Sequence, residues 1–382
     1  MNYRILGKTG EKVSVLGFGC MRLPVIGGDM KNINISETTR MIRYAIDHGV
    51  NYIDTAFIYH GCKSEEAVAQ ALRDGYREKV FLATKLPVWN VNNYEDMERL
   101  LDKQLSNLET ECIDFYLVHS LNRSYWAKLV GLGLFDFLRS AKDKGKVKHL
   151  GFSFHDDYDV FQKIVDSFPW SFCQIQYNYL DENFQAGKKG LEYAAKSGLG
   201  VVIMEPLRGG SLANGLTPQA KEIIEQAPMK KDPAEWALRW VWNHSEVGVV
   251  LSGMTEMNHV IANVQYAEQS EVSLTPEEKD VISSVQRTYL DKRQISCTAC
   301  KYCMPCPSGV DIPQCFEYYN RAHMMENVKA ARFWYNRISK ASNCTECGQC
   351  ETHCPQNIPI KDKLKEVAGL FETDDAIQSP AG

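Results

Sequence analysis

Eight cysteines toward the C-terminal end of the 382-residue chain fall into two closely spaced runs. Thiolates at this spacing bind 4Fe-4S clusters, and where two clusters share such runs, the fourth cysteine of each run binds the cluster of the other run. The sequence therefore predicts two 4Fe-4S clusters and a protein that transfers electrons. The runs are Cys297, Cys300, Cys303 and Cys306, followed by Pro307, and Cys344, Cys347, Cys350 and Cys354, followed by Pro355.

The fourth ligand of each cluster is the open point of this assignment. The pattern gives Cys354 to the cluster held by the first run and Cys306 to the cluster held by the second run. The first run is one residue short at its end, because only two residues separate Cys303 from Cys306. Cys315 follows nearby and is an alternative ligand to Cys306.

Structural zinc and disulfides are the other uses of paired cysteines. One zinc ion would take two C-x2-C pairs and leave four of the cysteines without a role, whereas two 4Fe-4S clusters use all eight. A disulfide framework fits less well, because the N-terminal residues MNYRILGKTGEK contain no apolar signal segment that would direct the chain to an oxidising compartment. Iron–sulfur clusters are the interpretation that the spacing favours.

Composition limits the partners of the protein. The formal net charge is -5 with 24% charged residues, and lysine and arginine are dispersed, so no basic patch indicates a nucleic-acid partner. No apolar run approaches the roughly 18 residues that a membrane span requires. We therefore expect a cytoplasmic protein with neither a nucleic acid nor a membrane as its partner.

Most of the chain has the pattern of repeated βα units. Short β-rich apolar segments alternate with amphipathic segments of helix length, and eight such strands are the number that closes a (β/α)8 TIM barrel. The glycine-containing turn within residues 3–12 predicts a hairpin that caps the bottom of the barrel. The expected strands are residues 15–18, 51–54, 80–84, 113–118, 149–152, 172–175, 201–204 and 249–251.

The fold class expected is thus α/β, with the barrel domain at residues 1–290 and a small, mainly α-helical iron–sulfur domain at residues 291–382. The 37 residues between Cys306 and Cys344 carry apolar side chains at largely helical spacing. This long helical insert resembles the α-helical ferredoxin-like domains that carry 4Fe-4S clusters within larger redox enzymes.

Ionisable residues follow or end three consecutive strands of the expected barrel. They are Asp54, Lys85 and His119, and Tyr59 lies five residues after Asp54. Barrel enzymes have their active sites at this C-terminal end of the strands. The motifs around these residues resemble those of the aldo-keto reductases, and the resemblance covers about residues 3–270. The matching segments are Asp54-Thr55-Ala56-x-x-Tyr59, Thr84-Lys85 and Leu117-Val118-His119.

The resemblance implies a barrel that reduces carbonyls with a nicotinamide hydride and a catalytic tetrad of Tyr59, Lys85, Asp54 and His119. As hydride reaches a carbonyl carbon, negative charge develops on the oxygen, which needs a proton donor within hydrogen-bond reach. Tyr59 can donate, but a phenol of pKa about 10 is a weak acid near neutrality. A cationic Lys85 would lower that pKa, and Asp54 would keep Lys85 charged and oriented. His119 would polarise the carbonyl as neutral imidazole.

The cofactor residues follow partly from the barrel and partly from the resemblance. No G-x-G-x-x-G motif follows a strand, so a Rossmann domain is not expected. Barrels commonly bind phosphate on the loops after the seventh and eighth strands, which here contain Arg208, Gly209 and Gly253. The resemblance implies that Ser153 and Gln174 hold the nicotinamide carboxamide. It also implies that the cofactor is lined by Gly19, Met21, Met204 and Asn263.

The family's pattern is incomplete around the cofactor. Phe154 stands where the family has an asparagine, Met204 replaces the aromatic ring that stacks on nicotinamide, and Gly253 and His259 replace residues that grip a 2′-phosphate. The cofactor expected is NAD(P)(H) without a preference for NADP. Clusters transfer single electrons whereas hydride carries two, so a flavin, which can convert between them, is an alternative cofactor.

We therefore expect an iron–sulfur oxidoreductase of the aldo-keto reductase type. It would reduce a small carbonyl or oxidise an alcohol, and a redox protein could exchange electrons with its clusters. The alternative from another class is a non-enzymatic electron carrier or redox sensor whose barrel only binds a nucleotide.

Overall fold

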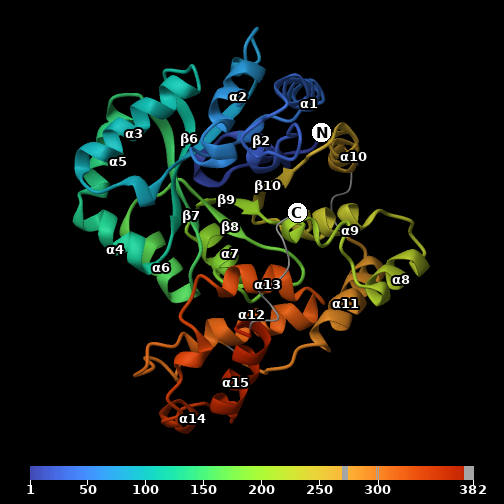
Figure 1. The fold of residues 1–382 in the computed structure, drawn as a ribbon. Helices are drawn as coiled ribbons and strands as arrows, with labels where there is room; N and C mark the ends of the chain where they lie inside the picture. Colours follow the sequence, from blue (N-terminus) through green and yellow to red (C-terminus); the bar gives the residue numbers. More distant parts are fainter. Residues whose placement is uncertain (269–273, 298, 300, 374–382) are drawn as a thin grey trace. The chain divides into compact units, whose positions relative to one another are not determined.

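The computed structural model describes residues 1–268, 274–297, 299 and 301–373. Eight parallel strands form a closed barrel in the order β10-β3-β4-β5-β6-β7-β8-β9, which confirms the predicted α/β TIM-barrel fold (Figure 1). Each strand overlaps one of the eight expected segments. Their bounds are β3 Leu16–Gly19, β4 Tyr52–Asp54, β5 Phe81–Leu86, β6 Ile113–Leu121, β7 Val147–Phe154, β8 Phe172–Gln176, β9 Gly200–Met204 and β10 Val247–Gly253.

The predicted N-terminal hairpin is present and closes one end of the barrel. Strand β1 (Tyr3–Ile5) pairs antiparallel with β2 (Lys12–Ser14). Leu6 and Val13 are completely buried and belong to the same core as the inward-facing side chains of the barrel. A Cβ atom on Gly200, the first residue of β9, would lie 2.5 Å from Leu6 Cγ, so only glycine permits this approach. The hairpin therefore plugs the N-terminal end of the strands.

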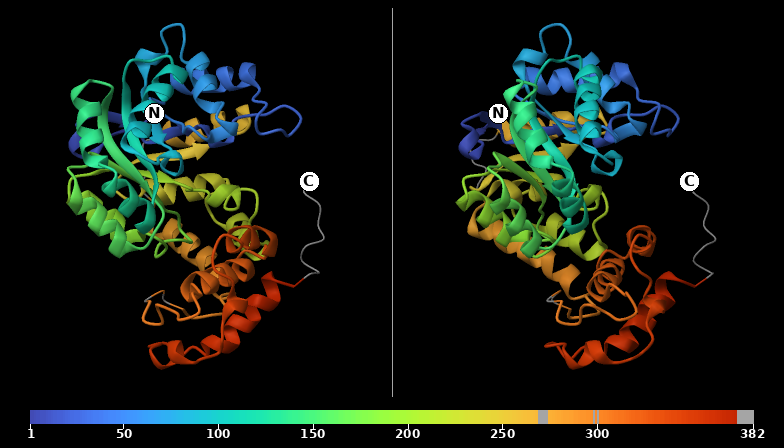
Figure 2. Two further views of the ribbon diagram at one scale, coloured as in Figure 1. Left: turned by 60° about the vertical axis from the view of Figure 1, so that its left-hand side comes forward. Right: turned by 90° about the vertical axis from the view of Figure 1, so that its left-hand side faces the viewer.

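Helices surround the strands of the barrel (Figure 2). Several begin at an asparagine or aspartate whose side chain accepts a hydrogen bond from a backbone N–H of the first turn, as Asn93 and Asp157 do. Their bounds are α1 Ile35–Asp47, α2 Ser64–Ala71, α3 Tyr94–Asn107, α4 Arg123–Gly131, α5 Leu134–Asp143, α6 Tyr158–Ser167, α7 Gly187–Lys196, α9 Pro233–Trp242 and α10 Met257–Glu268. Short 3-10 turns are η1 Gly7–Thr9, η2 Cys20–Arg22, η3 Tyr59–Gly61, η4 Arg77–Lys79, η5 Val88–Asn90 and η6 Arg208–Gly210.

The chain divides into two compact units, residues 1–215 with 231–279 and residues 216–230 with 280–382. The second unit is helical, with a core of its own around Cys315, Phe316 and Leu364. We retain a boundary between the barrel domain and the iron–sulfur domain near residue 290, where α11 ends, as a proposal. Helix α11 (Pro276–Leu290) begins in the first unit and continues into the second. The other elements of the second unit are α8 Pro218–Gln226, α12 Ile312–Met324, α13 Val328–Tyr335, η7 Ala341–Asn343, α14 Gln349–Thr352 and α15 Ile360–Phe371.

Among the described residues, every helix is too short or too polar to span a lipid bilayer.

Candidate active site

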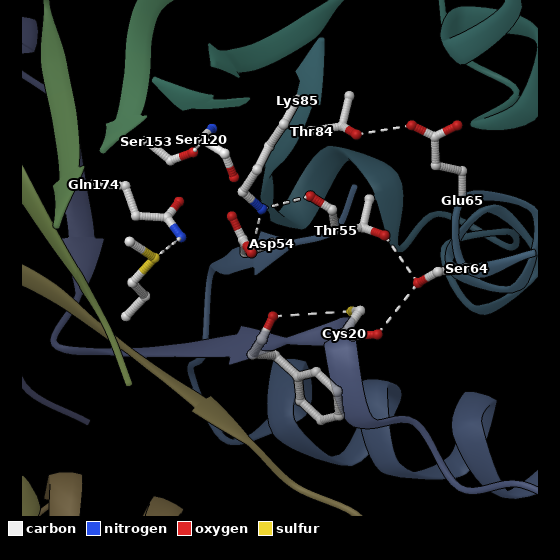
Figure 3. Close-up of polar contacts among 12 residues, drawn as sticks. Cys20, Asp54, Thr55, Ser64, Glu65, Thr84, Lys85, Ser120, Ser153 and Gln174 are labelled. Carbon is white, nitrogen blue, oxygen red and sulfur yellow. Dashed lines mark hydrogen bonds and ion pairs between the residues drawn. The ribbon is translucent and has the colours of Figure 1, made fainter. Parts of the chain in front are cut away.

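The buried ion pair between Lys85 and Asp54 forms the centre of the candidate site. Asp54 ends β4 and Lys85 lies near the end of β5, the next strand of the barrel. Lys85 Nζ donates to Asp54 Oδ1 at 2.7 Å and to the carbonyl oxygen of Thr55 at 2.7 Å (Figure 3). The side chains of the pair are 1% and 4% exposed. The closed barrel therefore brings these two residues together as the sequence predicts.

Tyr59 and His119 lie beside this pair. Tyr59 begins the 3-10 turn after β4, and Lys85 Nζ lies 5.1 Å from the centroid of its ring. The His119 ring, from β6, stands edge-on to the Tyr59 ring with 6.2 Å between centroids. Trp89 packs against the other side of this histidine, with ring centroids 5.0 Å apart. All four predicted tetrad residues thus converge at the C-terminal ends of the strands.

Burial and charge set the protonation of the ion pair. Burial alone would lower the pKa of Lys85, but Asp54 and Tyr59 raise it above its ordinary value. Burial raises the pKa of the Asp54 carboxyl, and the charge of Lys85 and its hydrogen bond offset part of that rise. The 2.7 Å contact favours a cationic Lys85 hydrogen-bonded to an ionised Asp54.

The pKa of Tyr59 differs from the prediction in its net direction. Burial raises the pKa of the phenol above its ordinary value, and the opposing effect of Lys85 is smaller. Lys85 does lower the pKa of the phenol as predicted, but burial has the larger effect and the net pKa lies above the ordinary value. For His119 burial, followed by the charge of Lys85, lowers the pKa well below its ordinary value, which makes it a neutral imidazole.

Two buried polar atoms of the tetrad have no hydrogen-bond partner among the described residues. They are Asp54 Oδ2 and His119 Nδ1. Buried polar atoms are almost always hydrogen-bonded, and one without a partner in a native protein needs an explanation. A ligand or ordered water in the barrel mouth would satisfy both.

A second buried carboxylate, Glu65, lies behind the tetrad and was not anticipated from the sequence. Its Oε1 accepts from Thr84 Oγ1 at 2.7 Å (Figure 3). The same oxygen accepts from Gln104 Nε2 at 2.9 Å, and Oε2 accepts from Asn107 Nδ2 at 2.9 Å. Gln104 Nε2 also donates to the carbonyl oxygen of Lys85 at 3.0 Å. The network ties helices α2 and α3 to the strand that carries Lys85.

The residues expected to hold a nicotinamide carboxamide lie on neighbouring strands. Ser153 of β7 and Gln174 of β8 are paired in register, and both are buried. Ser153 Oγ accepts from the backbone N–H of Ser120 at 2.7 Å, and Gln174 Nε2 donates to the sulfur of Met204 at 3.6 Å (Figure 3). Gln174 Oε1 is buried with no partner among the described residues, so it is free to accept from an amide N–H. These side chains therefore fit a carboxamide.

The other cofactor candidates are divided between the mouth and the interior of the barrel. Gly19 and Gly253 are paired at the ends of β3 and β10. Met21 is 51% exposed. Asn263 is buried on α10, and its Nδ2 donates to Ser252 Oγ at 2.9 Å, next to Gly253.

Arg208 is not a free cation for a phosphate. Its Nε donates to Asp181 Oδ2 at 3.0 Å, and both side chains are almost completely buried. Gln176 and Asn178 donate to the same carboxylate oxygen, each at 3.0 Å. Arg208 and Gly209 both have a positive φ, 47° and 70°, so the loop is sharply turned here. The ion pair fixes this loop. It also engages the Arg208 guanidinium, which was predicted from the sequence to bind the cofactor.

The two cysteine runs build the same local structure. Ala299 N–H donates to Cys297 Sγ and Glu346 N–H donates to Cys344 Sγ, both at 3.4 Å. Ala299 and Glu346 both have a positive φ, 55° and 54°. Equivalent loops with an amide directed at a cysteine sulfur are suited to thiolates, because an N–H donor stabilises the anion.

The two runs lie next to each other within the second unit. Ser308 Oγ and Thr345 Oγ1 are 2.9 Å apart, which joins the segment after Cys306 to the segment after Cys344. Six of the eight cysteines pack against one apolar core, Cys347 is exposed, and Cys300 lies outside the described residues. The six are Cys297, Cys303, Cys306, Cys344, Cys350 and Cys354.

Cys315, the alternative ligand, has a different environment. It is completely buried on α12, and its thiol lies 3.6 Å from the carbonyl oxygen of Ser339. Burial raises the pKa of this thiol to about 12. Cys306 is only partly buried and is linked through Ser308 to the second run, so Cys306 fits the fourth position better. Within the described residues, no three cysteine, histidine or acidic side chains converge on a site for one metal ion.

Comparison with known proteins identifies relatives of the first unit. "Probable aldo-keto reductase 1" from Glycine max is 25% identical over 301 residues, which are 68% of this chain and 82% of that protein. L-galactose dehydrogenase from Arabidopsis thaliana is 24% identical over 302 residues, or 74% and 92% of the two chains. These relatives match most of their own length to this chain.

Solved structures show the same barrel. The holo form of an aldo-keto reductase from Bacillus halodurans superposes with a TM-score of 0.64 at 25% identity, over 75% of this chain and 96% of that chain. An aldo/keto reductase from Klebsiella pneumoniae in complex with NADP and acetate gives a TM-score of 0.62 at 23% identity, over the same shares of 75% and 96%.

Two family models match the chain in sequence order. The model of the aldo/keto reductase family covers residues 15–286, and that of the 4Fe-4S dicluster domain covers residues 296–358. The first match spans most of the chain and includes every residue of the candidate tetrad. The protein therefore belongs to the aldo/keto reductase family and carries a 4Fe-4S dicluster domain after its barrel.

Proposed function

We propose that this protein reduces a small carbonyl, or oxidises the corresponding alcohol, at the tetrad of the barrel and exchanges single electrons through two 4Fe-4S clusters. The observation that carries the proposal is the convergence of Tyr59, His119 and the buried Lys85–Asp54 pair at the C-terminal ends of the strands. A surface ion pair or an isolated core histidine would not explain this grouping. The proposed compartment is the cytoplasm.

A bound nicotinamide would supply or accept the hydride. Tyr59 donates its phenolic proton to the carbonyl oxygen as negative charge develops there. Lys85 stabilises the phenolate that remains, because its positive charge lies 5.1 Å from the ring centroid. Asp54 holds this ammonium group in place, and neutral His119 orients the carbonyl by a hydrogen bond.

The raised pKa of Tyr59 bears on the direction of the reaction. A protonated phenol is the form required for carbonyl reduction, and burial of Tyr59 favours that form. Alcohol oxidation needs the phenolate, so it should gain from higher pH.

The nicotinamide would lie against Ser153, Gln174 and Met204, with the unpartnered Gln174 Oε1 accepting from its carboxamide. Gly253 and His259 supply no fixed cation for a 2′-phosphate, so we propose NAD(P)H without a preference for NADPH. The related Klebsiella pneumoniae protein binds NADP, which supports a nicotinamide dinucleotide in this fold. Flavin is the alternative cofactor, because it can divide a hydride into single electrons.

For the clusters we propose the crossed ligand sets. Cys297, Cys300, Cys303 and Cys354 would hold one cluster, and Cys306, Cys344, Cys347 and Cys350 would hold the other. The hydrogen bond between Ser308 and Thr345 supports the second set, because it joins the segment after Cys306 to the segment after Cys344. Bound to the second unit, the clusters would pass single electrons to or from a redox protein.

The test begins with full-length protein purified without oxygen. Iron, acid-labile sulfide, zinc and flavin are quantified, and oxidation of NADH and NADPH is followed with a panel of small aldehydes and ketones. We expect about eight irons and eight sulfides per chain, and carbonyl reduction that falls at least about 100-fold in Tyr59→Phe. Tyr76→Phe is the matched control, since that phenol bonds Asp47 on the exterior of the barrel.

Each alternative gives a distinct result. An electron carrier or sensor would show no carbonyl turnover, and its electron-transfer rate would be the same in Tyr59→Phe. Zinc without sulfide would refute the clusters, and stoichiometric flavin would replace the nicotinamide as the resident cofactor.

A further inference from the structure

Arg22 lies at the mouth of the barrel against two glycine-containing loops. It ends the 3-10 turn that follows β3, and its side chain is exposed. A Cβ atom built on Gly209 would lie 3.5 Å from Arg22 Nη2, and one built on Gly253 would lie 3.6 Å from Arg22 Nη1. The guanidinium therefore occupies the space beside Gly209 and Gly253 that side chains at these two positions would fill.

These two loops follow the seventh and eighth strands of the barrel. In (β/α)8 barrels the loops at these positions frequently form a phosphate-binding site. Gly209 and Gly210 have a positive φ, 70° and 96°, and a Cβ on Gly210 would meet no atom within 4 Å. The backbone here is thus uncovered on the side where a side chain would otherwise stand. A ligand can approach it closely.

The loops lack another available cation. Arg208, which was predicted from the sequence to bind the cofactor, is paired with buried Asp181. Arg22 makes no ion pair and no side-chain hydrogen bond within the described part of the chain. A guanidinium that stays charged and has several N–H donors without partners is suited to phosphate oxygens.

The backbone next to Arg22 is held in place. Leu23 N–H donates to His60 Nε2 at 3.0 Å, and His60 Nδ1 donates to the carbonyl oxygen of Met30 at 2.8 Å. His60 is buried and directly follows Tyr59. The loop that carries Arg22 is therefore anchored to the segment that carries the proposed proton donor, so less freedom is lost when Arg22 binds a ligand.

We propose that Arg22 binds the diphosphate of the nicotinamide dinucleotide, with its guanidinium between Gly209 and Gly253. This inference rests on the proposed function, since it requires a dinucleotide in the barrel mouth. The shared chemistry is an anion whose oxygens accept hydrogen bonds from the guanidinium, and a carboxylate of the carbonyl substrate is a second source of it. Of the two, the diphosphate is favoured, because Arg22 lies beside the two loops that frequently bind phosphate in this fold.

The experiment uses full-length, cluster-loaded protein with Arg22→Ala, Arg22→Lys and Arg40→Ala. Arg40 is a control on α1, the helix after the same loop, and it pairs with Glu37 on the surface. Dissociation constants are measured for NADH, ADP-ribose and adenosine by calorimetry. Steady-state constants are measured with matched aldehydes that do or do not carry a carboxylate.

For Arg22→Ala we expect the Kd of NADH and of ADP-ribose to rise about 10- to 100-fold, as a lost charged hydrogen bond predicts. The Kd of adenosine should stay unchanged, and kcat at saturating NADH should stay within about 3-fold. Arg22→Lys should recover part of the affinity, since lysine keeps the charge and loses the two-pronged geometry. Arg40→Ala should behave as the wild type does.

Unchanged affinity of Arg22→Ala for both NADH and ADP-ribose would overturn the inference. The same holds if only the KM of the carboxylated aldehyde rises, because Arg22 would then face the substrate. Equal weakening of adenosine would indicate a general distortion of the loop and would also contradict it. If wild-type protein binds no nicotinamide dinucleotide, the proposed function itself fails, and that result is separate from any effect of Arg22.

Discussion

Lys85 Nζ lies 2.7 Å from Asp54 Oδ1 in a part of the barrel that water barely reaches. The pair links two adjacent strands and supplies the positive charge beside Tyr59. Removal of one member leaves the other as a buried, unpaired charge, which costs far more than the loss of a surface pair.

We therefore expect Asp54→Ala to lower the free energy of unfolding by about 3–5 kcal/mol. Asp74→Ala, which breaks a surface pair with Arg43, should cost less than about 1 kcal/mol. The double variant Asp54→Ala with Lys85→Met should recover part of the stability while catalysis stays lost. Urea titrations followed by circular dichroism give the free energy of unfolding of each variant. If the loss in the double variant equals the sum of the losses in Asp54→Ala and Lys85→Met, the ion-pair account is contradicted.

Glu65 supports β5, the strand that carries Lys85, through hydrogen bonds. Glu65→Leu should destabilise the barrel by at least about 3 kcal/mol, because the donors of Thr84, Gln104 and Asn107 would lose their acceptor. Since Gln104 also bonds the carbonyl of Lys85, kcat should fall with little change in KM. The measurements are urea titration and steady-state kinetics. Glu66→Leu, one residue along on an exposed pair with Lys63, is the control and should change neither quantity.

His119 should give stability a pH dependence of known sign. Its folded pKa lies well below the ordinary value of about 6.5. The unfolded chain therefore takes up a proton as pH falls below about 6.5 while folded His119 does not, so stability present above that pH is lost toward acid. Compared with His119→Asn, the wild type should lose about 1 kcal/mol more between pH 6.5 and 5.5, and the extra loss should approach about 1.4 kcal/mol per pH unit at lower pH. Denaturation at pH 7.5, 6.5 and 5.5 measures it, and parallel profiles would refute the buried neutral state.

The cysteine assignments predict which substitutions remove iron. Cys347→Ser should leave one cluster, so that iron falls from about eight to about four per chain. Cys315→Ser should keep all the iron, because a serine hydroxyl can make the same hydrogen bond to Ser339. Cys306→Ser is the deciding variant. Full iron in that protein together with loss in Cys315→Ser would transfer the ligand role to Cys315.

The strands and the tetrad could be predicted because their signals are local. Each strand is a short apolar run, and a barrel brings successive strand ends to one rim, so Asp54, Lys85 and His119 had to meet once the strands were identified. The first three cysteines of each run have the same C-x2-C-x2-C spacing, so the similarity of the two runs was visible in the sequence.

The ion pair between Arg208 and Asp181 was not predictable, because it joins two loops 27 residues apart whose conformations no local pattern sets. The sequence contains only a weak indication that Glu65 is buried. It lies three positions before Val68, which is the helical spacing that puts both residues on the buried side of α2. Its partners come from 19 to 42 residues away. The net pKa of Tyr59 required the balance of burial against one charge, which depends on packing around the phenol.

The plug formed by Leu6 and Val13 has a consequence for turnover. With one end of the barrel filled by the N-terminal hairpin, the proposed cofactor and substrate would share the entrance at the C-terminal ends of the strands. We therefore expect a compulsory order, in which the ligand that lies deeper binds first and leaves last. Its departure would then set an upper bound on the rate at saturation.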